Sequence, residues 1–450
     1  MATPHPTSDV VPPTRTERRA LIALLLLAAL LRLGVICWKP ESLAEDRDLY
    51  WGIAHRMAAG DGYVHPDWGH RTAYRPPLYP LLLSAIVCCG GGVKSLAVVQ
   101  IALSVATAWL TWWLARKLEL KSGALLATAF VALNPLLMQM TALAMTETLC
   151  GFLLMALLAC SIAGETPQPR APIGVLFGLT ALCRPTVWAF AILACVASVA
   201  CRVWRRSTDA GPSFGSAVAG WLAVVFATVV IVAPWGIRNV GLFQEFVVTT
   251  THGGYTLYLG NNDEAYRAEV ANPTDGSWDS RAWQKTLPQP FPGEDQFHEI
   301  LRDHWMSAHA HDWIRQHPRE FAELCWLRIK RFWNIFPGGA DAESLPRIAR
   351  WGMAFFFAIE LLAAAVGLWR LRRDEWLKWW PLVLLVLSFA VVHAVYWSNL
   401  RMRAPVEPVL ALLAARGLVS AKGSGLRFFG VGRSESHLPQ SRSSANSEKS

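Results

Sequence analysis

The sequence predicts an all-α polytopic membrane protein with about 10–11 transmembrane helices and extracytoplasmic loops. Hydrophobic residues make up 53% of the 450 residues and charged residues only 17%, unlike the composition of soluble domains. Apolar stretches of about 18 to 22 residues recur, and a helix needs about 20 residues to cross the bilayer core. The basic residues behind the net charge of +9 gather between these stretches, where they set orientation, and no nucleic-acid-binding motif is present.

Hydropathy divides the chain into five parts. They are a polar cytoplasmic tail at 1–19, an N-terminal transmembrane module at 20–234, an extracytoplasmic insert at 235–348, the C-terminal transmembrane helices at 349–420 and a disordered cytoplasmic tail at 421–450. The first apolar run, 20–38, has no convincing cleavage site and is expected to remain as the first span. The other spans are expected near 95–116, 122–141, 146–163, 171–183, 185–204, 214–234, 350–370, 377–397 and 404–419.

Clusters of basic residues predict which loops face the cytoplasm. These clusters are Arg15/Arg18/Arg19, Arg116/Lys117/Lys121, Arg202/Arg205/Arg206 and Arg370/Arg372/Arg373/Lys378. The positive-inside rule places all of them in the cytoplasm if the short, proline-opened segment 77–92 dips into the membrane without crossing it. The loop 39–76, the insert 235–348 and the connection His393–Arg403 then share the outer face of the plasma (inner) membrane.

The insert is expected to contain two amphipathic helices over about 295–335 that meet at His317–Pro318. Aromatic and basic side chains accompany their apolar positions. Such helices suit the headgroup layer of a membrane, and they equally suit packing against the rest of the insert.

Several short motifs follow one another between the spans. They are Asp46–Tyr50, Gly60–Tyr63, Arg75–Pro80, Asn134–Pro135, Met145–Glu147, Arg184–Pro185, Pro234–Asn239, Gly253–Asn262 and Arg401–Pro405. With this set, the chain resembles the glycosyltransferase C superfamily, in particular bacterial relatives of the dolichyl-phosphate-mannose protein mannosyltransferases and of the lipid A aminoarabinose transferase. The resemblance covers about 20–415 and is specific to the superfamily, not to one substrate.

The resemblance implies a cell-envelope enzyme that moves a hexosyl or pentosyl group from a polyprenyl-phosphate carrier to a protein, glycolipid or glycan acceptor on the outer face. It also implies inversion of the anomeric configuration. The expected partners are the lipid-linked sugar, the acceptor and membrane lipids, with no nucleic acid. No cofactor is certain. A divalent metal is possible, although Arg47 stands where the family often has Glu beside its catalytic Asp.

Three acids are the candidate catalytic residues: Asp46, Asp48 and Glu147. Asp46 matches the family's catalytic aspartate best, because Tyr50 follows it at the expected distance, and we expect it to be the general base that takes the acceptor's proton. Glu147 stands where family members carry an acid. The alternative is that these acids are favourable charges at helix starts.

Cations and polar groups near the expected outer boundary are the candidate substrate ligands. They are Tyr50, Arg75, Arg184, Arg238, Asn261, His393, Arg401 and Arg403. A departing lipid phosphate needs cations that bind its growing charge, and we expect Arg238, Arg403 and His393 to supply this contact. Alternatively, arginines at span ends extend to lipid headgroups, His393 is a hydrogen-bonded structural residue, and Asn261 belongs to an ordinary turn.

Other functions remain open from the sequence. A closer rival is an oligosaccharide ligase or polymerase that uses a pyrophosphate-linked donor. A lipid or solute transporter would show repeats and paired broken spans, whereas the polar residues here gather in outer loops. A non-catalytic scaffold would not need Asp46 to face a ring of arginines. The placement of Asp46 and Arg403 around one outward cavity would distinguish these classes.

Overall fold

The computed structural model describes residues 12–162, 170–205, 214–271, 283, 287, 296–338, 345–372 and 375–419. The chain divides into two units, Met1–Val419 and Ser420–Ser450, and all described residues lie in the first. The expected C-terminal tail at 421–450 and most of the tail at 1–19 therefore lie outside the described residues.

The regular secondary structure of the described residues is helical, apart from one isolated β-bridge between Val64 and Arg71. The elements in the first half are α1 (Arg15–Trp38), η1 (Pro40–Leu43), α2 (Tyr50–Ala58), α3 (Leu78–Cys88), α4 (Val93–Lys117), α5 (Gly123–Leu133), α6 (Pro135–Thr141), α7 (Glu147–Ile162), α8 (Ala171–Cys183) and α9 (Val187–Arg205). Those in the second half are α10 (Phe214–Phe243), α11 (Gly253–Gly260), α12 (Asp263–Tyr266), η2 (Arg267–Ala271), α14 (Gln296–Gln316), α15 (Pro318–Phe332), α17 (Arg347–Trp369), α18 (Trp376–Val395), η3 (Leu400–Val406) and α19 (Glu407–Leu418).

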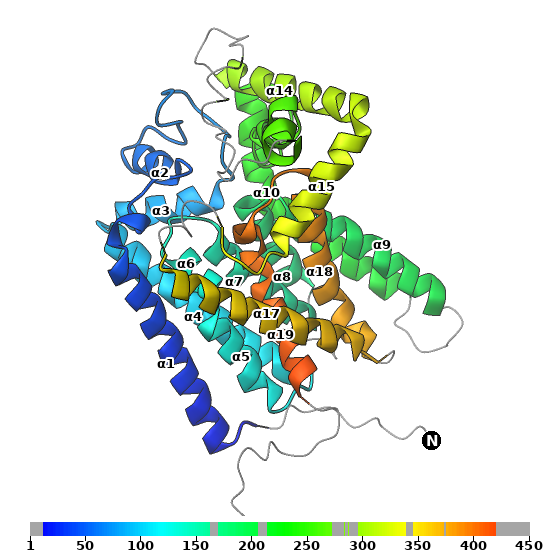
Figure 1. Ribbon diagram of the computed structural model, residues 1–450. Coiled ribbons are helices and arrows are strands. Elements are labelled where there is room, and N and C mark those ends of the chain that lie inside the picture. The colour runs from blue at the N-terminus through cyan, green and yellow to red at the C-terminus, as the bar shows by residue number, and fades with distance from the viewer. Residues whose placement is uncertain are drawn as a thin grey trace, which may run out of the picture. The chain divides into compact units, whose positions relative to one another are not determined.

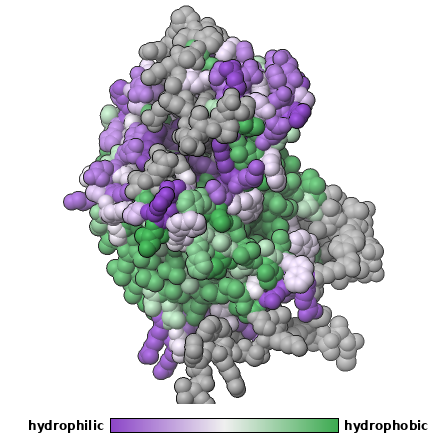
Figure 2. Space-filling model, viewed as in Figure 1, coloured by the Kyte–Doolittle hydropathy of each residue, from purple (hydrophilic) through white to green (hydrophobic). Residues whose placement is uncertain are grey.

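Among the described residues, five helices are long and apolar enough to cross a membrane: α1, α4, α10, α17 and α18. The pair α5 and α6, bent by 52° at its break, would be a sixth span, and α3, α7, α8 and α9 contain shorter apolar helices. Figure 2 shows a broad apolar belt below a polar region. The structure thus confirms an all-α, multi-pass membrane protein.

The segment 39–92 leaves and re-enters the bundle at one end. Glu17, at the start of α1, pairs with Arg116, at the end of α4, with 2.7 Å between Nη1 and Oε1. The two helices therefore run antiparallel, so the end of α1 and the start of α4 lie at the same end of the bundle. The 11 residues of α3 lie between them and cannot form a full crossing. This arrangement has the parity that the expected dip of 77–92 requires.

The break between α5 and α6 follows from the local sequence. Pro135 cannot continue a helix, and the Asn134 side chain instead caps α6 by accepting from the amides of Leu136 and Leu137 at 3.0 and 3.1 Å. The break leaves carbonyls at the end of α5 without helical partners. Arg32, fully buried in α1, donates to the carbonyls of Val131 and Ala132 at 2.9 Å each. Arg32 therefore caps the C-terminal end of α5, although it lies within an apolar segment.

The insert contains two helices in the range where the amphipathic pair is expected. α14 and α15 meet at His317, and Figure 1 places α14 at the end of the structure away from the start of α1. On α15, Leu324 and Phe332 are fully buried, whereas Trp326 is largely exposed. The buried face packs against α18, so the insert is attached to the membrane helices through α15.

Helices α17 and α19 approach each other closely because glycines face each other's backbone. A Cβ placed on Gly367 would lie 1.9 Å from the carbonyl oxygen of Leu413, and one on Gly417 would lie 2.0 Å from that of Ala363. Small residues at such crossings allow tight packing of membrane helices.

We expect Gly367→Ala to separate α17 from α19 and to destabilise the protein by about 1–3 kcal/mol, because the added methyl group overpacks the contact. Thermal unfolding of the detergent-solubilised protein measures this. The control is Gly352→Ala in the same helix, where a Cβ would meet nothing within 4 Å. Equal melting temperatures for the two variants would contradict the close contact.

Candidate functional site

Charged side chains from four parts of the chain meet at the end of the bundle where the insert begins. The first contact joins Asp48 and Arg75. The guanidinium of Arg75 donates from Nη2 to Oδ1 of Asp48 at 2.9 Å and from Nε to the Asp48 carbonyl oxygen at 3.0 Å. The Asp48 side chain keeps 25% of its surface exposed. Arg75 therefore fixes one carboxylate oxygen while the group stays accessible.

A second carboxylate, Glu147, begins α7 and is almost fully buried between two arginines. Its Oε1 lies 3.1 Å from Nη1 of Arg184, which follows α8, and 3.3 Å from Nε of Arg401 in η3. Its other oxygen, Oε2, is buried with no hydrogen-bond partner in the structure. Glu147 thus joins the ends of three elements that are distant in sequence and fixes two cations.

The electrostatics link the two contacts into one cluster. Burial raises the pKa of the Asp48 carboxyl, but the positive charges of Arg75, Arg401 and Arg184 outweigh this effect and lower the pKa overall. Asp48 is therefore ionised at neutral pH. We call Asp48, Arg75, Glu147, Arg184 and Arg401 the polar cluster.

Two further expected residues border the polar cluster. The buried ring of Tyr50 lies under the guanidinium of Arg75, 5.6 Å from its carbon, and packs edge-on against Tyr79. His393 lies near the end of α18, and its Nδ1 is 2.8 Å from the Trp397 carbonyl oxygen. Its other ring nitrogen, Nε2, is buried and has no hydrogen-bond partner among the described residues. Arg184 and Arg401 are the charges that act on His393.

Asp46 does not contact the arginines in the way its motif suggested. Its Oδ1 accepts from the amide of Trp51 at 3.0 Å and its Oδ2 from the amide of Gly52 at 2.7 Å. Both amides belong to the first turn of α2, so Asp46 caps this helix. Leu49 adopts a left-handed conformation with φ of 65°, and this turn directs Asp46 to the helix start.

The structure corrects the expected role of Arg403. Its side chain is fully buried and its Nε lies 2.5 Å from Oε1 of Glu407, one turn along the chain. Its Nη1 also donates to the carbonyls of Phe332 and Asn334, at 3.1 Å each. Arg403 therefore joins η3 to the end of α15 and has no access to a lipid phosphate. Because Arg403 has no exposed surface, it cannot line an outward cavity together with Asp46.

Asn261 and Arg238 also lie apart from the polar cluster. Asn261 is fully buried and donates to the carbonyls of Leu257 and Val395, so it holds the end of α11 and is not a sugar ligand as expected. Arg238 donates to the Tyr63 carbonyl at 3.2 Å and lies 4.5 Å over the Trp235 ring. It faces the same loop as Arg75 from the side of α10.

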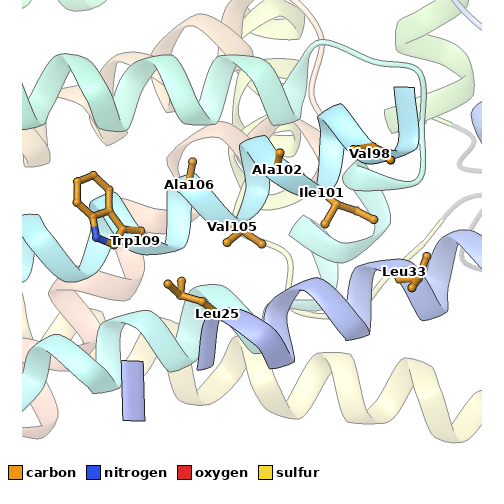
Figure 3. A pocket seen from close by; sticks show the side chains of 8 residues that line it. All are labelled: Leu25, Leu33, Val98, Ile101, Ala102, Val105, Ala106 and Trp109. Carbon is orange, nitrogen blue, oxygen red and sulfur yellow. The ribbon is translucent and has the colours of Figure 1, made fainter. Parts of the chain in front are cut away.

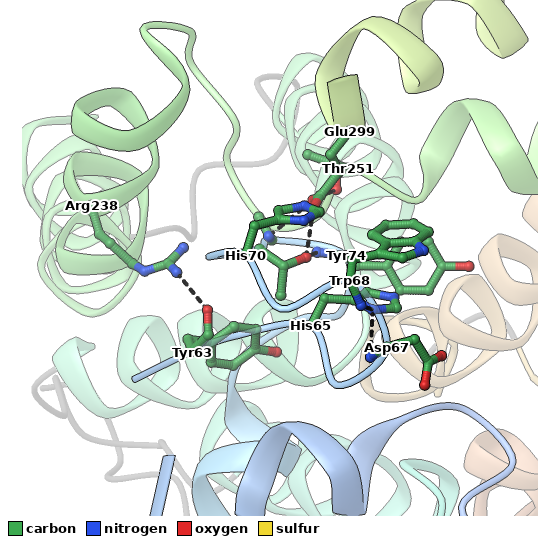
Figure 4. Close-up of polar contacts among 11 residues, drawn as sticks. Tyr63, His65, Asp67, Trp68, His70, Tyr74, Arg238, Thr251 and Glu299 are labelled. Carbon is green, nitrogen blue, oxygen red and sulfur yellow. Dashed lines mark hydrogen bonds and ion pairs between the residues drawn. The ribbon is translucent and has the colours of Figure 1, made fainter. Parts of the chain in front are cut away.

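The sequence did not single out the residues that hold this loop to the insert. Figure 4 shows Glu299 of α14 reaching His70 and Thr251, with Trp68 stacked on His65. Burial lowers the pKa of His65 to about 4, so this ring is neutral. The first-loop partners of Glu299, which are His70, Thr72 and Ala73, lie more than 220 residues away in the sequence, and no spacing rule connects them.

The donor set does not form a metal site within the described part of the chain. No group of three or more His, Cys, Asp or Glu side chains is placed to hold a metal ion there. Asp48 and Glu147 are each neutralised by arginine, and Asp46 is directed to helix amides. The residues present therefore fit an anion better than a divalent cation.

A groove between α1 and α4 is lined by apolar side chains only and has a volume of about 730 Å³. Figure 3 shows its lining by Leu25, Leu33 and Trp109 among others. None of the polar cluster lines it, so it is separate from the candidate site.

Asp303 of α14 accepts from the Gly254 amide at 2.7 Å, and burial raises the pKa of its carboxyl to about 6. The ionised form is therefore disfavoured in the folded protein. Between the usual pKa and about 6 the folded state binds more protons than the unfolded state, so this group's contribution to stability falls as pH rises through that window.

We expect Asp303→Asn to remove this pH dependence, because the amide oxygen still accepts from Gly254 without carrying a charge. Melting temperatures of both proteins, recorded at pH values on either side of the pKa of about 6, measure this pH dependence. The variant should gain stability relative to the parent as pH rises. A difference in melting temperature between variant and parent that stays constant across this pH range would contradict a raised pKa at Asp303.

Comparisons with known proteins agree on one type of protein. Residues 74–237 match the family model described as dolichyl-phosphate-mannose-protein mannosyltransferase. The archaeal oligosaccharyltransferase AglB from Archaeoglobus fulgidus, solved with an inhibitory peptide and a dolichol-phosphate, is 13% identical with a TM-score of 0.50. That match covers 90% of this chain and 50% of AglB, so the chain spans about half the length of that protein.

A second crystal structure of the Archaeoglobus fulgidus oligosaccharyltransferase, in the apo form, also has a TM-score of 0.50, with 13% identity over 89% of this chain and 51% of that one. ArnT from Cupriavidus metallidurans, bound to undecaprenyl phosphate, is 14% identical over 90% of this chain and 78% of its own, with a TM-score of 0.37. No curated protein sequence matches the chain. The family match over residues 74–237 and the shared fold agree with the resemblance to the glycosyltransferase C superfamily.

Proposed function

We propose that this protein, which has the glycosyltransferase C fold, transfers a sugar from a polyprenyl-phosphate carrier to an acceptor hydroxyl at the outer face of the plasma membrane. The acceptor is a protein, a glycolipid or a glycan. The observation that carries the proposal is the polar cluster: an accessible carboxylate, Asp48, held by Arg75 beside two further arginines at the end of membrane-embedded helices.

The cluster has the charge that such a donor requires. Its two carboxylates face three arginines, which leaves one positive charge for an anionic ligand. A phosphate that bears more negative charge as the sugar leaves would be stabilised by this excess. The name of the matching family model and the dolichol-phosphate bound to AglB support a lipid phosphate as the anion.

We assign Asp48 as the general base, in place of Asp46. The oxygens of Asp46 accept the two amides that begin α2, whereas Asp48 has one oxygen on Arg75 and an exposed surface. In the reaction, the acceptor oxygen bonds to the anomeric carbon as the bond from that carbon to the phosphate oxygen breaks. The proton of the acceptor goes to Asp48 and the electron pair of the broken bond goes to the phosphate, with inversion at the carbon.

The low pKa of Asp48 suits this reaction. A carboxylate with lowered pKa is a weak base, but it is ionised throughout the neutral range. A phosphate is a good leaving group, so the sugar carbon becomes electron-poor early and the acceptor proton is acidic when it is transferred. Arg184, Arg401 and Tyr50 then bind the donor beside the base.

A transporter is less well supported by the structure. The broken span at α5 and α6 is the kind of feature that transporters use for binding. Here, however, Arg32 and Asn134 satisfy the freed backbone groups, and both side chains are fully buried. The break therefore stabilises the bundle. An oligosaccharide ligase with a pyrophosphate-linked donor remains the second candidate, because AglB has the same fold.

We expect Asp48→Asn to reduce transfer by about 10²–10⁴-fold, because an amide cannot take the acceptor's proton. Asp46→Asn is the matched control: its amide oxygen can still accept one α2 amide, so we expect a smaller loss. The assay follows sugar transfer in membranes, together with mass analysis of the lipid-linked sugars that accumulate when the gene is deleted.

The comparison distinguishes the two carboxylates. Loss of transfer in Asp46→Asn with full activity in Asp48→Asn would return the base to Asp46. Full activity of both would refute the proposed mechanism. Accumulation of a sugar linked through a single phosphate would support the favoured donor, and a pyrophosphate-linked oligosaccharide would favour the ligase.

The proposed sidedness is tested with cysteines in an otherwise cysteine-free protein. Arg319, at the start of α15, has an exposed side chain in the insert. Glu119, after α4, has an exposed side chain at the opposite end of the bundle. Because the basic clusters gather at the end of α4, we expect a membrane-impermeant maleimide to label Arg319→Cys in intact cells and Glu119→Cys only after permeabilisation. The reverse pattern would place the polar cluster in the cytoplasm.

A further inference from the structure

Glu299, on α14 of the insert, is a buried carboxylate surrounded by hydrogen-bond donors. It accepts from the Thr72 hydroxyl at 2.6 Å, from the Ala73 amide at 3.0 Å and from the Thr251 hydroxyl. Nε2 of His70 lies 3.2 Å away. The side chain is only 2% exposed, and a buried charge is costly unless such donors surround it.

Two of these donors, Thr72 and Ala73, lie directly before Arg75 in the chain. The backbone between Ala73 and Arg75 is fixed from several sides. The Ala73 carbonyl accepts from the Thr251 amide at 3.0 Å, and the Tyr74 carbonyl accepts from the Thr250 hydroxyl at 2.7 Å. The Arg75 carbonyl accepts from the Tyr63 hydroxyl at 2.8 Å. Glu299 therefore contacts both of the paired chain segments: the first loop through Ala73, and the segment before α11 through Thr251.

The neighbouring turn of α14 holds the other side of the same region. Asp303 binds the Gly254 amide at 2.7 Å, and a Cβ on Gly254 would lie 2.0 Å from the Asp303 carbonyl oxygen. This contact fixes the start of α11, whose Tyr255 stacks on His252, which in turn lies against Tyr74 at 4.4 Å. Two carboxylates on one face of α14 thus hold the two chain segments beside Arg75.

We propose that Glu299 is a positioning residue: the insert, through Glu299, holds the 72–75 segment so that Arg75 contacts Asp48 and an anionic ligand. The inference rests on the proposed function for the identity of the ligand, a lipid phosphate. The insert then determines the affinity of the site at the membrane surface, although it contributes no charge to the polar cluster.

The experiment compares Glu299→Gln with Asp312→Asn in the purified full-length protein. Gln has nearly the same shape, but its amide nitrogen cannot accept from Thr251 or Thr72. Asp312 lies on the same helix, 63% exposed, and serves as the control for a lost carboxylate. Two quantities are measured: the rate of trypsin cleavage after the exposed Arg71, and the affinity for undecaprenyl phosphate.

We expect Glu299→Gln to be cleaved faster and to bind undecaprenyl phosphate about tenfold more weakly, the size of effect that one charged hydrogen bond produces. Asp312→Asn should match the parent in both. On an Arg75→Ala background, Glu299→Gln should still be cleaved faster but should lose no further affinity, because its effect on binding passes through Arg75. A purely structural residue would weaken binding equally on both backgrounds.

Undiminished affinity in Glu299→Gln, or an equal further loss on the Arg75→Ala background, would overturn the inference. If Glu299→Gln fails to fold, Thr251→Val removes one donor while keeping its volume, and the same comparison applies to it. If the parent protein does not bind undecaprenyl phosphate, the proposed donor is wrong. In that case the cleavage rates alone test whether Glu299 fixes the first loop. Equal cleavage rates in the parent and in Glu299→Gln would overturn this part of the inference.

Discussion

The buried Glu147 carboxylate between Arg184 and Arg401 is the interaction on which the site depends. It brings together the start of α7, the residue after α8 and the 3-10 segment η3, which leave the bundle at one end. Burying an unpaired arginine at that depth would be costly, so the three elements are held together by mutual charge compensation. The Asp48–Arg75 pair then adds one further ion pair from the first loop, and the cluster as a whole retains a positive charge.

Six of the candidate residues lie in or beside the polar cluster: Asp48, Tyr50, Arg75, Glu147, Arg184 and Arg401. The sequence related them only through the parity of the spans, which assigns the first loop and the ends of α7, α8 and α18 to one side. The Glu17–Arg116 pair sets α1 and α4 antiparallel, which is the arrangement that this parity requires. Contacts formed across the fold were not predictable. Glu299 meets its partners in the first loop only because the insert folds back over it.

Two candidate residues have surroundings that differ from the expected ones, for separate physical reasons. The family motif favours Asp46 over Asp48, and the motif does not reveal that Leu49 takes a left-handed turn that directs Asp46 to the α2 amides. For Arg403 a signal was present in the sequence: Glu407 follows four residues later, the separation at which helical side chains pair. Read as an ion pair, that spacing predicts a structural arginine. The same criterion leaves Arg401 as a candidate ligand, because its acidic partner, Glu147, is distant in the sequence.

Accessibility separates the structural arginines of this protein from those of the site. Arg32 and Arg328 donate to backbone carbonyls that a break or a helix end has freed, and Arg403 is paired with Glu407. Each is fully buried and therefore out of reach of a ligand. Arg75, Arg184 and Arg401 instead share two carboxylates and keep 14%, 13% and 29% of their side-chain surfaces exposed. The proposed anionic headgroup would therefore meet accessible arginines whose positive charge exceeds that of the carboxylates beside them. The anion selectivity that we propose depends on both features together: arginines that stay accessible, and too few carboxylates to neutralise them.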